Sequence, residues 1–251
     1  MILIASPHTM RQEQDGTVWD SLPYWFQGIK ALNGKFHTYL YLNDYTPSTD
    51  VWHEIEEVDV NYDIATVGLS PNVRSNKARH LDNFQRFADC KNACLRYARK
   101  GGYQYLFLVD SDIVLPQISL DTLLANIGPF AVLSLALNNT IRNRAKVGIQ
   151  HIYNYGNRIQ GKKVGVGIVN CIYTGACCLI NLERVPEDVW YVSGKNGEDI
   201  PFCKELGSRG CRIGCYTNLE AYHVMNPSLI PGVQFFLEGI PTPEAYRKCP
   251  I

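Results

Sequence analysis

The sequence predicts an α/β protein built on a mixed, mainly parallel sheet with helices on both faces. Three observations support this fold class. Strand-like and helix-like segments alternate through the first half of the chain, which is typical of connected βαβ units. Apolar residues make up 46% and charged residues 19% of the sequence, so a sizeable core is expected and disorder is not. The length of 251 residues suits one large domain.

The elements of the first half follow from periodicity and from glycine punctuation. Residues 2–6 are apolar and predict the first strand. The stretch 17–34 predicts a helix that ends at Gly34. Alternating residues over 35–44 and the run 61–70 predict the second and third strands.

Residues 82–100 change to helical spacing, with an apolar face that Lys91 interrupts, and Gly101-Gly102 ends this helix. The strand 105–109 comes next, then a helix over 119–127 and a strand over 130–137.

The second half is expected to be richer in β-structure. Its predicted strands cover 163–171, 175–182, 211–217 and 219–224, with a short helix over 199–206. Residues 1–225 are therefore expected to form a single domain. The proline-rich segment 226–251 predicts an irregular tail packed on that domain.

Charge and cysteine content narrow the class of protein. The 24 basic residues balance 24 acidic residues, so no long-range field favours nucleic acid. The N-terminus resembles a strand rather than a signal peptide, and no apolar run reaches the roughly 18 residues of a membrane span. We therefore expect a cytoplasmic protein, free or peripheral to a membrane. The odd count of nine cysteines predicts mainly buried thiols, with room for one disulfide.

Two carboxylates mark the end of the apolar strand 105–109. Asp110 and Asp112 are separated only by Ser111, and side chains at i and i+2 share a direction where a strand stays extended. Like charges so placed repel unless one is protonated or a cation lies between them. Oxygen ligands suit Mg²⁺ or Mn²⁺, and the carboxyl edge of an α/β sheet is where ligands bind. The plainer interpretation is a polar turn.

Four segments in order resemble a known family. "YLFLVDSD" resembles the D-x-D strand of metal-dependent glycosyltransferases with the GT-A fold, in particular family 2. Lys91-Asn92, "YTGACCLI" and "GEDIPFCKELGSRGCRIGCYTNLEAYHV" resemble three further segments of that family, so the resemblance covers roughly residues 2–225. The chain departs from the family pattern at Lys91, where arginine is common, and at Pro7-His8-Thr9, which matches loosely.

The resemblance implies a GT-A fold and transfer of a hexosyl group from a UDP- or GDP-sugar to an acceptor hydroxyl on a glycan, lipid or protein. It implies Mn²⁺ or Mg²⁺ held by Asp110, Asp112 and His223. It also implies that Asp199 is the general base of an inverting enzyme, with Glu198 as the alternate. The plainer interpretations are a surface or core histidine at 223 and a carboxylate that interacts with a helix dipole at 199.

The donor side is less well defined by the sequence. Lys91 either contacts the donor or extends its amine to solvent, and Gly175 either admits a sugar or marks a bulge. Residues 74–80 are cationic and form either a solvated loop or a cover over the donor phosphates. The residues expected at the donor are Pro7, Thr9, Lys91, Asp110, Ser111 and Gly175.

Two other functions compete with glycosyl transfer. "DSDIVLP" also matches the opening motif of haloacid-dehalogenase-like phosphatases, in which Asp110 would be a nucleophile and Asp112 an acid/base. That motif usually follows the first strand, whereas here more than a hundred residues precede it. A non-catalytic module that binds nucleotide sugars or glycans is the third interpretation.

Overall fold

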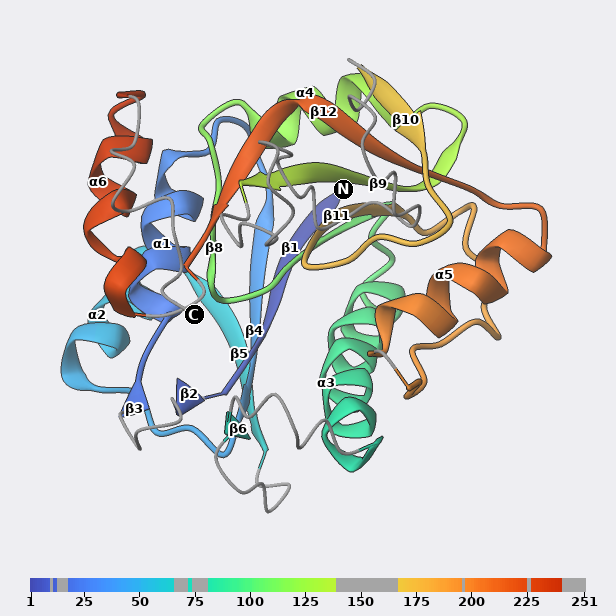
Figure 1. The fold of residues 1–251 in the computed structure, drawn as a ribbon. Coiled ribbons are helices and arrows are strands. Elements are labelled where there is room, and N and C mark those ends of the chain that lie inside the picture. Colours follow the sequence, from blue (N-terminus) through green and yellow to red (C-terminus); the bar gives the residue numbers. More distant parts are fainter. Residues whose placement is uncertain are drawn as a thin grey trace, which may run out of the picture.

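A computed structural model describes residues 1–9, 11–12, 18–65, 72–73, 81–138, 167–195, 197–224 and 227–240. One curled sheet forms the centre, and helices cover both of its faces (Figure 1). Its strands lie in the order β10-β12-β9-β11-β7-β1-β4-β5, and β8 pairs with β12. Their bounds are β1 Ile2–His8, β4 His37–Asn43, β5 Val60–Ala65, β7 Tyr105–Val109, β8 Ile113–Val114, β9 Phe130–Asn138, β10 Ile168–Asn170, β11 Cys177–Asn181 and β12 Arg212–His223.

Most strands of this sheet run in one direction. β1 pairs in parallel with both β4 and β7, β4 with β5, and β9 with β12. β11 lies antiparallel between β7 and β9, while β8 and β10 are antiparallel to β12. The predicted mixed, mainly parallel sheet is therefore confirmed, and the carboxyl ends of β1 and β7 meet at one edge.

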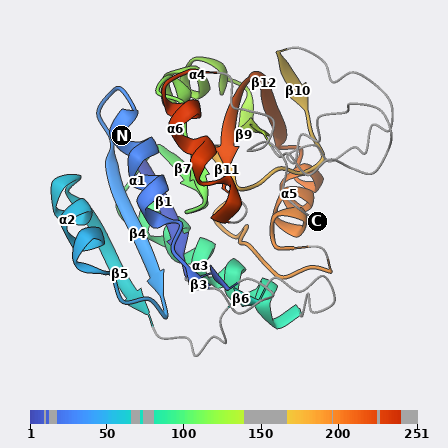
Figure 2. The same cartoon turned by 60° about the vertical axis from the view of Figure 1, so that its left-hand side comes forward.

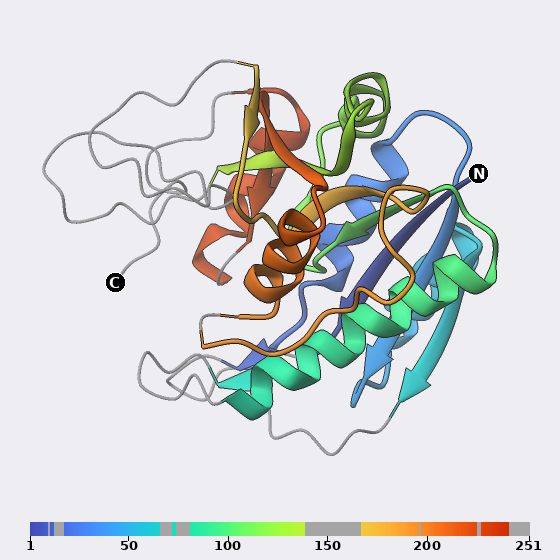
Figure 3. The same cartoon turned by 90° about the vertical axis from the view of Figure 1, so that its right-hand side faces the viewer.

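Each face of the sheet has its own core. Ile4 of β1 packs with Trp25 and Phe26 in the cluster under α1 (Leu22–Ala31), α2 (Thr49–Glu57) and α4 (Ser119–Asn126). Its neighbours Leu3 and Ala5 point the other way, into the cluster under α3 (Leu81–Lys100) and α5 (Asp199–Ser208). Alternation along β1 thus supplies both layers. Figure 2 brings α1 and α2 forward, and Figure 3 shows the face covered by α3 and α5.

The helix α3 is confirmed within one residue of the predicted start. Ala88, Leu95 and Ala98 are buried at helical spacing, and Gly102 follows the helix with a left-handed φ of +64°, a conformation that glycine adopts without strain. Figure 3 shows α3 crossing the sheet below α5.

Several elements differ from expectation. The predicted helix 17–34 begins only at Leu22, because Val18–Trp19 forms β3 and Asp20 accepts the backbone N–H of Leu22. α2 was not predicted; only Val51 and Ile55 of this short helix are buried, which leaves a weak periodic signal. The two strands predicted over 211–224 are one strand, β12, with an irregularity between Tyr216 and Glu220. β3 forms a small second sheet with β2 (Arg11–Gln12) and β6 (Asn72–Val73).

The described part of the tail is helical, so the prediction of an irregular tail is wrong there. A 3₁₀ turn at Pro227–Leu229 precedes α6 (Pro231–Leu237), whose first turn holds a proline, as helix starts allow. Val233 packs with Trp19 and Tyr222 in a third apolar cluster. Within the described residues no helix is long and apolar enough to cross a membrane.

Candidate active site

Asp110 and Asp112 lie where β7 leaves the sheet. The Asp110 N–H donates to the carbonyl of Ala176 at 2.7 Å, and the Ile113 N–H donates back to the carbonyl of Asp110 at 3.0 Å. This turn ends the extended conformation at Ser111, so the two carboxylates lie in different surroundings. The side chain of Asp110 is 29% exposed, whereas that of Asp112 is 1% exposed.

His223 meets Asp112 through the pairing of β12 with β8. His223 pairs with Ile113, and the Val224 N–H donates to the Asp112 carbonyl at 2.8 Å. These bonds bring the imidazole Nε2 within 2.5 Å of Asp112 Oδ2. Two of the three residues expected to hold a metal are therefore in direct contact, although 111 residues separate them in sequence.

The side-chain atoms of Asp112 and His223 are of the kinds that bind divalent cations. Carboxylate oxygen and imidazole nitrogen together suit Mn²⁺, and carboxylates suit Mg²⁺. Among the described residues, no group of three or more histidine, cysteine, aspartate or glutamate side chains is gathered as a ready cation cage. Of the three residues predicted to hold a metal, Asp112 and His223 are thus in contact. Asp110 lies two residues before Asp112 in the sequence.

Lys91 is the centre of a second, acidic cluster. Its Nζ lies 2.7 Å from Glu198 Oε1, 2.7 Å from Asp199 Oδ1 and 3.7 Å from Asp110 Oδ1. The lysine is 2% exposed, so its amine does not extend to solvent. Burial opposes its charge, but Asp110, Asp199 and Glu198 raise the pKa of Lys91 well above its ordinary value.

Asp199 opens helix α5 and is held close to the backbone of Gly175. A Cβ added to Gly175 would lie 1.9 Å from Asp199 Oδ2, so only glycine leaves room for this carboxylate. Burial, together with the like charges of Glu198 and Asp110, raises the pKa of Asp199 to about 7, although Lys91 acts in the opposite direction. A carboxylate with a pKa near neutrality suits a general base.

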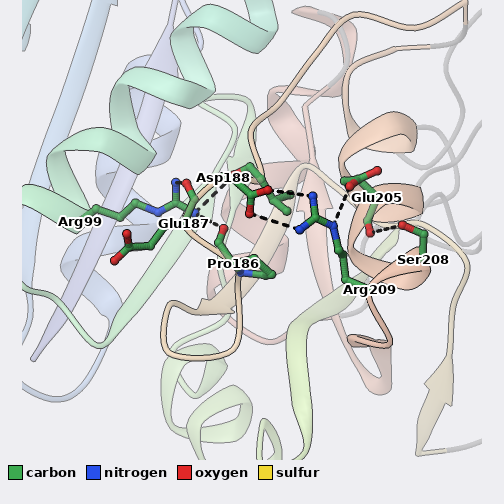
Figure 4. Close-up of polar contacts among 8 residues, drawn as sticks. Arg99, Pro186, Glu187, Asp188, Glu205, Ser208 and Arg209 are labelled. Carbon is green, nitrogen blue, oxygen red and sulfur yellow. Dashed lines mark hydrogen bonds and ion pairs between the residues drawn. The ribbon is translucent and has the colours of Figure 1, made fainter.

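The segment before α5 is tied to α3 by side-chain bonds to backbone groups. Asn92 donates to the Tyr191 carbonyl at 2.8 Å and accepts the Tyr191 N–H at 2.9 Å. Arg99 donates to the carbonyls of Glu187 at 2.8 Å and Pro186 at 2.9 Å, and its guanidinium lies 4.4 Å from the Trp190 ring. Figure 4 shows Arg99 reaching this segment.

Arg209, which follows the last residue of α5, forms exposed ion pairs with Asp188 of the preceding segment and with Glu205 of the helix (Figure 4).

Sequence reasoning did not assign His8, which links Ser111 to Asp20. His8 Nδ1 lies 2.8 Å from Ser111 Oγ, and its Nε2 lies 3.2 Å from Asp20 Oδ1. Ser21 Oγ lies 3.1 Å from the same Ser111 hydroxyl, and Tyr45 donates to Asp20 at 2.5 Å. The only signal for His8 was its position at the end of the first strand, the edge where ligands bind.

The remaining predicted donor residues are placed as follows. Pro7 lies in β1 and Thr9 directly after it, both half-buried, at the same edge of the sheet as Ser111. The cationic stretch 74–80 lies outside the described residues. All eight described cysteines are free thiols, six of them buried, in line with the expectation for those positions.

Comparison with protein-family models and with curated proteins finds no match. Solved structures do match. The mannosyltransferase PcManGT from Pyrobaculum calidifontis, solved with GDP-Man and Mn²⁺, is 10% identical with a TM-score of 0.56 and covers 90% of this chain and 57% of its own. S. aureus TarS 1–349 with UDP-GlcNAc is 15% identical with a TM-score of 0.52 and covers 88% and 57%.

A third match is glucosyl-3-phosphoglycerate synthase from Mycobacterium tuberculosis, solved with Mn²⁺, UDP and phosphoglyceric acid. It is 11% identical with a TM-score of 0.50 and covers 96% of this chain and 79% of its own. The chain thus spans little more than half the length of the first two matches. At such identity the likeness concerns the fold, and it confirms the predicted GT-A arrangement.

Proposed function

We propose that this chain is a hexosyltransferase that moves a sugar from a nucleoside-diphosphate sugar to an acceptor hydroxyl and requires a divalent cation. One observation carries the proposal: two carboxylate sites of different chemistry lie together at the carboxyl edge of the sheet. The Asp112–His223 pair offers metal ligands, and the cluster around Lys91 offers a carboxylate with a pKa of about 7. The metal-dependent displacement of a diphosphate needs both kinds of group.

The matched structures support this choice over the two competing functions. They were solved with GDP-Man and Mn²⁺, with UDP-GlcNAc, and with Mn²⁺, UDP and phosphoglyceric acid. They favour a UDP- or GDP-sugar as donor and Mn²⁺ as the first cation to test. A phosphatase with Asp110 as nucleophile finds less support, because Asp110 Oδ1 faces the ammonium of Lys91 in a glycosyltransferase-like fold.

The chemistry assigned to the chain's own residues is proton transfer and positioning. Asp199, with 23% of its side chain exposed, accepts the proton of the acceptor hydroxyl as its oxygen attacks the anomeric carbon of the sugar. The bond from that carbon to the diphosphate breaks, and the nucleoside diphosphate leaves with the electron pair. Ser111, held by His8 and Ser21, keeps the turn between Asp110 and Asp112 in place.

Asp112 and His223, with Asp110 beside them, would hold the cation. A bound Mn²⁺ or Mg²⁺ supplies Lewis-acid stabilisation of the negative charge that develops on the leaving diphosphate. Pro7 and Thr9, at the end of β1, are the proposed contacts of the nucleoside.

A donor panel with two matched variants tests the proposal. Purified protein is incubated with UDP-glucose, UDP-GlcNAc or GDP-mannose, with and without Mn²⁺, and release of UDP or GDP is measured with a panel of sugar and lipid acceptors. We expect release that depends on Mn²⁺ and is abolished by Asp112→Asn, while Asp121→Asn, which changes an exposed aspartate on α4, keeps it. Hydrolysis of p-nitrophenyl phosphate without any release would support the phosphatase and sink the proposal.

A further inference from the structure

The ammonium of Lys91 is occupied by protein carboxylates. An ammonium carries three protons, and Glu198 Oε1 and Asp199 Oδ1 each accept at 2.7 Å. The third neighbour, Asp110 Oδ1, lies at 3.7 Å. Because only 3% of the lysine side chain is exposed, this charge is directed at the acidic cluster and is shielded from solvent.

An aromatic ring also lies close to the ammonium of Lys91. Lys91 Nζ lies 5.6 Å from the centroid of the Tyr191 ring, within the range of a cation–π contact. Tyr191 in turn stacks on Phe202 of α5, with ring centroids 3.9 Å apart and planes 13° apart. Lys91 belongs to α3, and Glu198 and Asp199 stand at the start of α5. The Tyr191 ring, which contacts both Lys91 and Phe202, therefore lies between the two helices.

Gly175 confines the other side of the same carboxylate. The position of a Cβ at Gly175 would lie 1.9 Å from Oδ2, 2.2 Å from Cγ and 2.8 Å from Oδ1 of Asp199. All three distances are far inside van der Waals contact, so the Asp199 carboxylate rests against the Gly175 backbone. The backbone of Gly175 is not left-handed, so the requirement for glycine here is one of space.

We propose that Lys91 and Gly175 together fix the carboxylate of Asp199 for proton abstraction, which makes Lys91 a positioning residue for the base rather than a ligand of the donor. Lys91 holds one oxygen through a charged hydrogen bond, and Gly175 provides the surface against which the other oxygen lies. The inference rests on the proposed function, in which Asp199 is the base. It assigns these two residues to the acceptor half of the reaction.

Two substitutions with matched controls test the proposal. Gly175→Ala places a methyl group where the Asp199 carboxylate lies, and its control Gly207→Ala adds the same methyl in open space on α5. Lys91→Met removes the charge and keeps the length of the buried stem, and its control Lys204→Met changes an exposed lysine of α5. We expect both site variants to lose about 100-fold in kcat, the effect of a misplacement of about 1 Å, while the donor KM and the Kd for UDP or GDP stay within about twofold of the wild-type values.

The outcomes separate the possible roles. A donor role for Lys91 predicts that Lys91→Met raises the donor KM and the nucleotide Kd together, and a purely structural role predicts a lower melting temperature with unchanged kcat per folded molecule; either result overturns the proposal. Should Lys91→Met not fold, the kinetics of Gly175→Ala decide alone.

A readout without turnover keeps the two proposals distinguishable. Crystal structures of wild type and Gly175→Ala should show the Asp199 carboxylate displaced from Lys91 in the variant. An unmoved carboxylate refutes the positioning of Asp199. Absence of transfer by the wild type across the donor panel refutes the proposed function instead, and the displacement of Asp199 in crystals then still decides whether Gly175 and Lys91 fix that side chain.

Discussion

The proposed role of Asp199 depends on its burial and on three charged neighbours, because together they set the pKa of its carboxyl group. Burial and the charges of Glu198 and Asp110 favour its protonated form, and Lys91 favours the ionised form. The balance leaves the pKa of Asp199 at about 7, against 3.8 for an ordinary aspartate. About half of the molecules carry an ionised Asp199 at pH 7, and that carboxylate is basic enough to take a proton.

The rate of transfer should therefore depend on pH in a defined direction. Because Asp199 must be ionised to act, kcat/KM should rise with pH, level off above about 7, and fall about tenfold for each pH unit below it. Lys91 lowers the pKa of Asp199, so Lys91→Met should move this limb to higher pH. Initial rates between pH 5.5 and 9 measure both effects.

Replacement of the base provides the control for that profile. Asp199→Asn should reduce kcat by about 10²–10⁴-fold and remove the limb, while Asp121→Asn should leave rate and limb as in the wild type. A wild-type profile that is flat from pH 6 to 8 would contradict the assignment of Asp199 as base.

Candidate site residues could be proposed from the sequence more easily than the contacts among them. Asp110 and Asp112 follow a predicted strand directly, and the resemblance to a known family singled out Asp199 and His223; all four remain predictions as site residues. The contacts among them do not follow from local patterns, since Lys91 and Asp199 are 108 residues apart and His8 and Ser111 are 103 apart. The sequence placed Lys91 on an apolar helix face and left its partner undefined; the three carboxylates explain why a charge is tolerated there.

At the scale of elements, side chains of α3 hold the segment that leads into α5. Asn92 and Arg99 face the segment 186–191 and satisfy its backbone groups. Such bonds replace the strand pairing that would otherwise hold an extended segment in place. Because Lys91 and Asn92 are adjacent in α3, the helix contacts both the acidic cluster and the segment 186–191 that precedes α5.

Removal of the Asn92 amide should loosen this segment. Asn92→Ala leaves the buried N–H and carbonyl of Tyr191 without their partner, and each such loss costs about 1–3 kcal/mol. Urea unfolding should show a lower free energy of unfolding, and hydrogen exchange should rise across 186–193. The matched control is Gln85→Ala, which removes an exposed bond from the same helix to Ser193. Equal effects of the two variants would contradict a special role for Asn92.

Apolar runs and periodicity predicted most of the long elements and missed the short ones. Strands β1, β4, β7 and β9 are mostly buried runs of several residues, and helix α3 has buried residues at helical spacing. The short strands β2, β3 and β6 contain two residues each, which is too few to show any periodicity. α6 was read as irregular because prolines dominate its surroundings, yet Pro231 stands in its first turn, where no hydrogen bond is lost.

At the scale of the whole molecule, the proposed binding of an anionic donor must rely on local groups, because the formal net charge is zero. A ligand that binds only the native state stabilises it by about 2.7 kcal/mol at one hundred times its Kd. UDP or GDP with Mn²⁺ should therefore raise the melting temperature, and EDTA should reverse the gain.

Variants locate that stabilisation. Asp112→Asn and His223→Gln should abolish the part that depends on Mn²⁺, while Asp121→Asn should keep it. If the nucleotide stabilises the protein equally with and without Mn²⁺, the cation does not contribute to nucleotide binding, which contradicts the proposed metal site.

The central pairing of β7 with β1 joins segments about a hundred residues apart, and the contact between Asp112 and His223 needs β12, which ends at His223. During translation, a ribosome-bound chain that has exposed only its first two hundred residues possesses the acidic turn but lacks its imidazole partner. The contact between Asp112 and His223 can therefore form only after β12 has been synthesised.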